Sequence, residues 1–425
     1  MLIRRRFEWN RELFFVLALV VIGSVMRWVW PGDMEWKGDE QWMYRHARDA
    51  AATGAFPPVG MMSGGGVVNP GLALWIFALV ARVAHDPIAM VRFVQGLNIA
   101  AIWAFLLCYC LHFEPQARRP WLWGIGFGSV SCLPVVLSRK LWAQCLLPPF
   151  GFLVFLGHLH RRAGWGAFLW GFASALLCQI HMSGFFFSAG LLLWTLWRDR
   201  ATGILRDTRW MYVLAGGVVG GVGLIPWLHA LPGGQPHTSV AQIFTLRFYW
   251  LWLALAWGID IQHSMAHSFW TGFLREPLLA GYPTWLMLAA HIFLLACGLR
   301  ALYLVVRSPM PDDDARFYVR AAAIGMGVLI TLSGVVIPEH YLIVLFPLAF
   351  VWAASIYRGR PRLLAAIAVA QLLVTATFLV HIHRFGGATQ SGPVFERFAR
   401  PTATDEYGAT YRSQGSTWCQ ADGCP

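Results

Sequence analysis

Charged residues are scarce in this sequence: Asp, Glu, Lys and Arg make up only 13% of its 425 residues. Soluble domains carry about twice that share, so the composition argues against an ordinary soluble protein. Acidic residues are the rarer kind, with 21 against 33 basic residues. The basic residues lie in short runs between apolar segments, which indicates membrane topology rather than nucleic-acid binding. With 57% hydrophobic residues, the chain is predicted to be an all-α polytopic membrane protein.

The sequence also lacks the residue spacings that are typical of metal-binding sites. No Cys and His residues follow the pattern of a zinc site. Most of the eight cysteines lie in apolar segments, where they are expected to pack as small side chains. The other two, Cys419 and Cys424, are compatible with a disulfide if the tail lies in an oxidising compartment. No internal repeat is evident, which weakens a transporter interpretation.

The first apolar run covers residues 13–30 and follows a basic N-terminus that contains Arg4, Arg5 and Arg6. The run is long enough to span a bilayer, and no small-residue cleavage site follows it. We therefore expect a retained first helix with its basic end in the cytoplasm.

Apolar stretches and the distribution of arginines together predict about eleven transmembrane helices. Two further stretches, 69–86 and 243–260, have apolar cores of only about ten residues, a length that suits interfacial helices. With both in the interface, every connection expected in the cytoplasm carries at least two arginines, as the positive-inside rule favours. The predicted spans are 13–30, 88–111, 121–137, 145–160, 163–182, 184–197, 210–228, 283–306, 321–337, 341–357 and 363–381.

This topology places three segments outside the membrane: a first loop at 31–87, a second long loop at 229–282 and a tail at 382–425. Residues 1–381 are expected to form one membrane-embedded domain. Loops of this length are not needed as connectors, so we expect the function at the extracytoplasmic surface. The predicted location is the bacterial inner membrane, with the N-terminus in the cytoplasm and the C-terminus outside.

Two adjacent carboxylates, Asp39 and Glu40, lie in the first loop. The segment that follows has helical propensity and ends at Gly54, a residue typical of a helix C-cap. Asp39 then lies at the helix start, where the helix dipole favours a carboxylate as an N-cap. Local sequence alone leaves a capping role and a catalytic role open.

The order of several short motifs resembles the GT-C membrane glycosyltransferases, in particular the protein O-mannosyltransferases and the bacterial aminoarabinose transferase of lipid A. The motifs are "GDE" in the loop after the first span, "VVNPGLALWIFA" before an interfacial helix, "LSRKLWAQ" after the third span and "PEHYLIVLFPLAF" in a late span. The resemblance covers most of the chain in topology. The order and sidedness of the motifs carry more of it than any single motif does.

The resemblance implies an inverting transfer of a sugar from a polyprenyl-phosphate carrier to an acceptor hydroxyl outside the membrane. Asp39 would act as the general base or hold it, with Glu40 beside it, because an attacking hydroxyl must lose its proton. The phosphate leaving group needs cations more than a general acid. The implied partners are a lipid-linked sugar donor, a glycan, lipid or protein acceptor, and membrane lipids.

Some positions depart from the family pattern. Met43 stands where the family has an aromatic residue, and Tyr44 follows one position later. Gln144 stands at an acidic position, and His340 replaces an arginine. These changes leave the acceptor and any metal open. No cofactor is firmly implied, because one carboxylate pair without a second acid makes no strong case for a divalent ion.

Further side chains are candidates to hold the carrier phosphate or to line the cavity. Arg139 and Lys140 end the third span on the outer side, where snorkelling at the interface is the alternative. His340 can equally cap its own helix. His263 and His267 are too few for a metal site and are expected on a polar helix face. The complete set of candidates is Tyr44, Arg139, Lys140, Gln144, His181, His340 and Tyr341.

Two other functions remain as alternatives. A transporter or flippase of lipid-linked sugars would need charged residues near the middle of its spans, whereas the charges here gather at span ends. A non-catalytic scaffold would use the first loop as a docking surface. It would not require Asp39 and Glu40 to share a cavity with Arg139 and His340.

Overall fold

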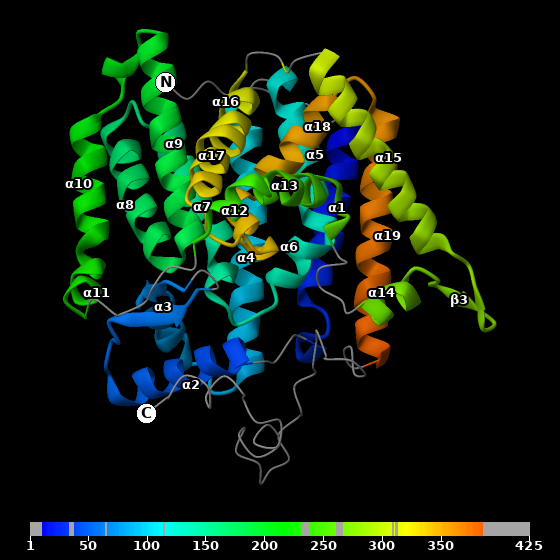
Figure 1. Ribbon diagram of the computed structural model, residues 1–425, viewed down its shortest axis with the longest axis horizontal. Helices are drawn as coiled ribbons and strands as arrows, with labels where there is room; N and C mark the ends of the chain where they lie inside the picture. Colours follow the sequence, from blue (N-terminus) through cyan, green and yellow to red (C-terminus); the bar gives the residue numbers. More distant parts are fainter. Residues whose placement is uncertain are drawn as a thin grey trace.

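The computed structural model describes residues 11–33, 38–63, 66–113, 115–230, 238–260, 267–307, 310 and 313–385, and most of them are helical (Figure 1). This confirms the prediction of an all-α protein. The first half contains α1 (Arg11–Trp28), η1 (Pro31–Asp33), α2 (Gly38–Thr53), α3 (Leu72–Ala81), α4 (Pro87–His112), α5 (Pro115–Val130), α6 (Cys132–Leu137), η2 (Ala143–Leu146), α7 (Leu147–Leu159), α8 (Gly164–Ile180) and α9 (Met182–Ala201).

The second half begins with a short helical turn, η3. Its elements are η3 (Leu205–Asp207), α10 (Trp210–Gly221), η4 (Val222–Leu224), α11 (Ile225–Ala230), α12 (Val240–Phe244), α13 (Arg247–Trp257), α14 (His267–Phe273), α15 (Leu286–Arg307), α16 (Asp314–Arg320), η6 (Ala321–Met326), α17 (Gly327–Leu332), η7 (Glu339–Leu345), α18 (Leu348–Ile356) and α19 (Pro361–Phe385).

Each predicted span lies on one or more of these helices, but fewer than eleven are long and apolar enough to cross a membrane. Within the described residues five qualify by length and composition: Pro87–His112, Trp210–Ala230, Leu286–Arg307, Asp314–Leu332 and Pro361–Arg384. A sixth exists if η7 and α18, which are bent by 76° at Pro347, form one span. The eleven-span prediction is not met because several helices are short or, like α1, carry charged residues at both ends.

The two long loops contain helices of their own, as predicted. In the first loop, α2, α3 and the strands β1 (Val59–Met62) and β2 (Val68–Pro70) gather at one end of the helical bundle (Figure 1). In the second loop, α13 crosses the front of the bundle, and a small hairpin of β3 (Leu278–Leu279) and β4 (Tyr282–Pro283) projects at one side.

The helix predicted after Asp39 is confirmed. α2 ends at Thr53, and Gly54 adopts a left-handed φ of +70°, the conformation that favours glycine after a helix. Buried residues of α2 recur every three or four positions, at Glu40, Met43, Ala47 and Ala50. That spacing places them on one helical face, so one of the two adjacent carboxylates is turned inward.

The glycine-rich segment at 60–71 contains backbone pairing. β1 and β2 are antiparallel, with Met62 opposite Val68. The Asn69 side chain donates a hydrogen bond to the Met61 carbonyl at 2.9 Å. The Trp227 indole donates to the Val68 carbonyl at 3.0 Å and so connects the hairpin to α11.

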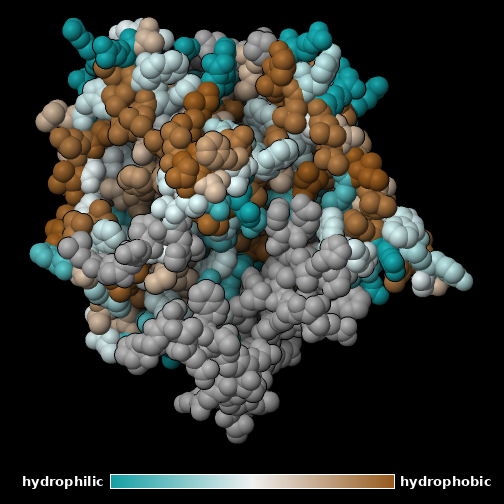
Figure 2. Space-filling model, viewed as in Figure 1, coloured by the Kyte–Doolittle hydropathy of each residue, from teal (hydrophilic) through white to brown (hydrophobic). Residues whose placement is uncertain are grey.

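The visible face of the molecule carries an apolar band. Figure 2 shows hydrophobic side chains across its middle and hydrophilic side chains along the upper edge. Exposed apolar residues on the membrane-length helices include Val218, Leu299 and Val306. Apolar exposure on this scale is typical of a surface that contacts lipid, and it agrees with an integral membrane protein.

Glycines allow α8 and α10 to approach closely. A Cβ atom at Gly216 would collide with the Phe168 carbonyl, and one at Gly220 would meet the Phe172 carbonyl. Gly217 lies on the other side of α10, where a Cβ would meet nothing within 4 Å. Small residues spaced four apart are a recurrent contact between membrane helices because they let the backbones touch.

Replacing Gly216 with Val should destabilise the protein, because the new side chain forces α8 and α10 apart. The expected loss is about 1–3 kcal/mol. Gly217→Val is the matched control and should stay within about 0.5 kcal/mol. Thermal unfolding of both variants in detergent compares them, and equal unfolding temperatures would contradict this account of the packing.

Candidate functional site

The segment between α6 and η2 brings several candidate residues into the interior. α6 ends at Leu137, and the chain then turns through residues 138–142 before η2 begins. Arg139 and Lys140 are both buried there, although each is a residue type that is almost never buried without partners. Their partners come from α1 and α2, far away in the sequence.

Lys140 forms a buried ion pair with Glu40. The ammonium Nζ lies 3.0 Å from Glu40 Oε1, and the side chains are only 4% and 1% exposed. Asp39, one position earlier, lies on the exposed side of the first turn of α2. The two adjacent carboxylates therefore have different environments: Glu40 faces the interior cation, and Asp39 faces outward.

Aromatic contacts extend this ion pair toward the late helices. The Lys140 ammonium lies 3.6 Å from the centroid of the Trp142 ring, within cation–π range. The Trp142 ring meets the His340 ring edge to face, with centroids 4.8 Å apart. Glu40, Lys140, Trp142 and His340 thus form a continuous chain from α2 to η7, which we call the ion-pair cluster.

A second group of candidates lies against His340. The His181 ring packs on the Tyr341 ring at 4.6 Å, and its centroid is 6.3 Å from that of His340. His181 Nδ1 accepts a hydrogen bond from the Ser183 backbone N–H at 3.1 Å and so caps α9. His181 Nε2 lies 3.2 Å from the Gln144 side-chain amide. Four of the predicted residues therefore meet at this place.

Two predicted residues lie apart from these groups. Arg139 donates hydrogen bonds to the carbonyls of Met26, Val29 and Trp30 at 3.1, 2.7 and 2.6 Å, and so closes the C-terminal end of α1. The Tyr44 hydroxyl donates to the His85 carbonyl at 3.0 Å. Both contacts are structural: Arg139 connects its turn to the end of α1, and Tyr44 connects α2 to the segment before α4. Phosphate binding by Arg139 stays a prediction.

Several sequence predictions fall on residues that the structure does not describe. His263 lies outside the described ranges, and so do Cys419 and Cys424; of His267 only the backbone, in α14, is described. Among the described side chains, no group of three or more His, Cys, Asp and Glu residues is arranged to hold a metal ion.

Asp260 is a buried acid that the sequence reasoning did not single out. It follows α13, is 1% exposed, and neither carboxylate oxygen has a hydrogen-bond partner among the described residues. Burial, with a smaller contribution from the charge of Glu339, raises the pKa of Asp260 to about 8. The only sequence signal was an acid at the end of an apolar segment, which also marks ordinary surface residues.

Glu339 connects this region to an apolar cavity. Arg247 at the start of α13 donates to Glu339 Oε1 at 3.1 Å and to the Ile337 carbonyl at 2.7 Å. Arg247 also lines a cavity of about 520 Å³ between α13 and α15, whose other walls include Trp250, Leu299 and Leu302. Arg247 therefore links the cavity lining to Glu339, the residue that precedes His340 in the sequence.

Comparison of the chain with models of protein families, with curated proteins and with solved structures finds no match in any of the three.

Lys140→Met should be strongly destabilising, because it leaves the Glu40 carboxylate buried without its cation. Breaking such a pair costs about 3–5 kcal/mol. Adding Glu40→Gln to Lys140→Met removes the orphaned charge and should restore a large part of the loss. Unfolding in detergent measures both, with Arg45→Met on the exposed side of α2 as the control. A double variant no more stable than Lys140→Met would refute the buried pair.

Asp260 should make stability depend on pH. Unfolded, its carboxyl group loses a proton near its ordinary pKa of 3.8, whereas folded it keeps the proton to about pH 8. Between these values the folded state binds more protons, so stability should fall as pH rises. Asp260→Asn should flatten this slope in unfolding temperatures measured from about pH 5 to 9. The exposed Asp49→Asn should keep it, and an unchanged slope in Asp260→Asn would exclude this assignment.

Proposed function

We propose that the protein is an inverting glycosyltransferase of the GT-C class, which moves a sugar from a polyprenyl-phosphate carrier to an acceptor hydroxyl. The reaction takes place on the extracytoplasmic side, at the end of the bundle that carries α2. The observation that carries the proposal is the ion-pair cluster, since it joins the first-loop carboxylate of Glu40, the neighbour of Asp39, to a cation and a histidine.

Asp39 is assigned as the general base. A base must reach the acceptor hydroxyl, and Asp39 lies on the exposed side of α2 in its first turn. Glu40 is engaged with Lys140 at 3.0 Å, so it supports the site by keeping this cation in position. The different exposure of the two carboxylates thus divides their roles: Asp39 accepts the proton and Glu40 positions Lys140.

Lys140 and His340 are assigned to the carrier phosphate. The Lys140 ammonium has three donors and can bind a phosphate oxygen while it remains paired with Glu40. His340 is linked to it through Trp142. A cation beside the leaving phosphate stabilises the charge that develops as the sugar bond breaks. His181 and Tyr341 pack against the His340 ring, and the Gln144 amide contacts His181.

The apolar cavity between α13 and α15 is assigned to the carrier chain. Its lining suits an isoprenoid, and its volume of about 520 Å³ accepts several isoprene units of a longer chain. Arg247 lines it and pairs with Glu339, the neighbour of His340, so a lipid tail in the cavity would direct its phosphate toward the ion-pair cluster. This continuity favours a lipid-linked donor over a soluble one.

Asp39→Asn should abolish transfer while the protein still inserts into membranes. Loss of a general base reduces rates by about 10²–10⁴-fold. The test complements a deletion strain with the wild-type chain, Asp39→Asn or Asp49→Asn and analyses envelope glycans by mass spectrometry. Wild type and Asp49→Asn, an exposed acid of the same helix, should restore the missing glycan.

Two results would count against the proposal. If Asp39→Asn restored the glycan at an equal protein level, Asp39 would not be the general base. A deletion strain with an unchanged glycan profile would remove the transferase itself. Accumulation of a lipid-linked sugar on the cytoplasmic leaflet would instead favour the flippase alternative.

A further inference from the structure

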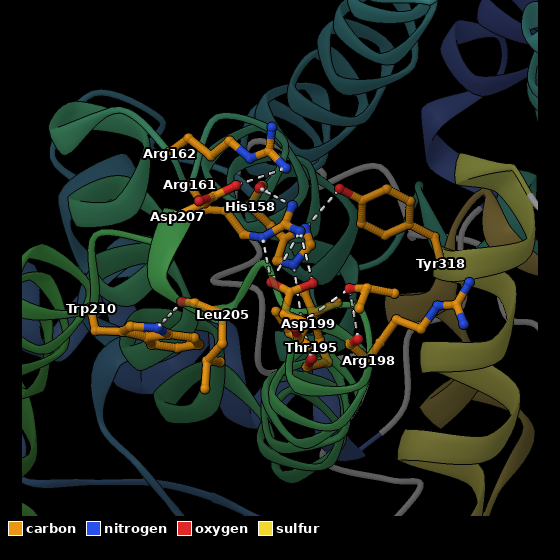
Figure 3. Close-up of polar contacts among 12 residues, drawn as sticks. His158, Arg161, Arg162, Thr195, Arg198, Asp199, Leu205, Asp207, Trp210 and Tyr318 are labelled. Atoms are coloured by element: carbon orange, nitrogen blue, oxygen red, sulfur yellow. Dashed lines mark hydrogen bonds and ion pairs between the residues drawn. The ribbon is translucent and has the colours of Figure 1, made fainter.

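A second cavity lies at the end of the bundle opposite α2. Its volume is about 640 Å³, and its walls come from the α7–α8 turn, the end of α9 and α16 (Figure 3). Its charged lining consists of the arginines Arg161, Arg162, Arg198, Arg316 and Arg320 and the aspartates Asp199, Asp313 and Asp314. Arg162 is also paired, at 3.4 Å, with Asp207, which does not line the cavity. With Asp207 included, five arginines stand against four aspartates, so the cavity favours an anion. None of these residues belongs to the ion-pair cluster.

The floor of this cavity is held by buried hydrogen bonds. His158 Nδ1 lies 2.7 Å from the Tyr318 hydroxyl, and His158 Nε2 lies 2.9 Å from Thr195 Oγ1. These contacts join α7, α16 and α9. The floor is therefore fixed before any ligand arrives, which lowers the entropy lost on binding.

One arginine of the wall is held in place by a buried acid. Both Arg161 Nε and Nη2 donate to the Asp199 carboxylate, at 3.3 and 3.2 Å, and Asp199 is 1% exposed. This fork-shaped contact fixes the plane of the guanidinium. Figure 3 shows Arg161 and Asp199 facing each other, with Arg198, the residue before Asp199 on α9, beside them. This pair is neutral overall, so it shapes the wall, and the excess positive charge of the lining comes from the other arginines.

The cavity borders an apolar, exposed flank of α9. Trp197 lines the cavity and is 58% exposed, and Leu193, one turn earlier on the same face, is 51% exposed. Tryptophan is enriched at the depth of lipid headgroups. A ligand with an anionic head in the cavity can thus place apolar tails along α9.

We propose that this cavity binds the phosphate headgroup of an anionic membrane phospholipid, with the acyl chains against Leu193 and Trp197. Arg198 on α9 and Arg316 on α16 face the cavity from different helices, so one phosphate between them joins the two helices. Basic pockets between membrane helices commonly select anionic lipids in this way. Inorganic phosphate has the same anionic group as the lipid head but no acyl chains. Comparing the two ligands therefore distinguishes a bound phospholipid from bound free phosphate.

The test measures unfolding of the full chain in neutral detergent with added phosphatidylglycerol, phosphatidylcholine or inorganic phosphate. Phosphatidylglycerol should raise the unfolding temperature by about 3–6 °C over phosphatidylcholine. Inorganic phosphate should have a much smaller effect. An equal effect of both phospholipids would overturn the proposal, and protection by inorganic phosphate equal to that of phosphatidylglycerol would overturn the lipid assignment.

Variants locate the effect. The double variant Arg198→Gln with Arg316→Gln should bind phosphatidylglycerol about tenfold to a hundredfold more weakly, as counted by native mass spectrometry. Arg206→Gln is the matched control, because Arg206 is an exposed arginine in the nearby η3 that does not line the cavity. Undiminished lipid binding in the double variant, or equal losses in both, would refute this location. The lipid comparison on the unsubstituted chain stands even if the double variant fails to fold.

Discussion

The buried ion pair between Glu40 and Lys140 is the interaction on which the arrangement of the outer end depends. Each partner is nearly inaccessible to water, so neither charge is tolerable without the other. The pair attaches α2 to the turn that follows α6, and the neighbouring Arg139 attaches that same turn to the end of α1. Trp142, at the end of the same turn, packs against His340 of η7. The five-residue turn 138–142 therefore contacts the first loop, α1 and η7. The candidate site exists only where these three meet.

The two ends of the helical bundle differ in how their charged side chains are accommodated. At the α2 end, cations are buried and bound to a carboxylate and to backbone carbonyls. At the opposite end, arginines line an open cavity, and two of them are held by acids: Arg161 by Asp199 and Arg162 by Asp207. Between the ends, close glycine contacts such as those of Gly216 let helices pack without polar groups. Under the two proposals, the protein would act on a lipid-linked anion at one end and bind an anionic lipid at the other.

Much of the fold and part of the site were predictable from the sequence. The helix after Asp39, its end at Gly54 and helices in both long loops were predicted correctly, because capping residues and apolar periodicity act over a few neighbours. The number of spans was not, because length alone does not reveal the break at Pro347 or the effect of charged residues at helix ends. Lys140, His340, His181, Tyr341 and Gln144 were singled out separately and do lie together. The carbonyl partners of Arg139 and the burial of Asp260 were missed.

Composition and local spacing are enough to show that the chain is helical and apolar, and which short polar stretches interrupt it. Which of two adjacent carboxylates faces inward depends instead on how the helices pack. That outcome depends on the helical phase of α2 and on a lysine from a distant turn, and burial of Glu40 is acceptable only once Lys140 is there to meet it. Helix packing also explains why five arginines that are far apart in the sequence line one cavity. They come together because α9 and α16 pack around the α7–α8 turn.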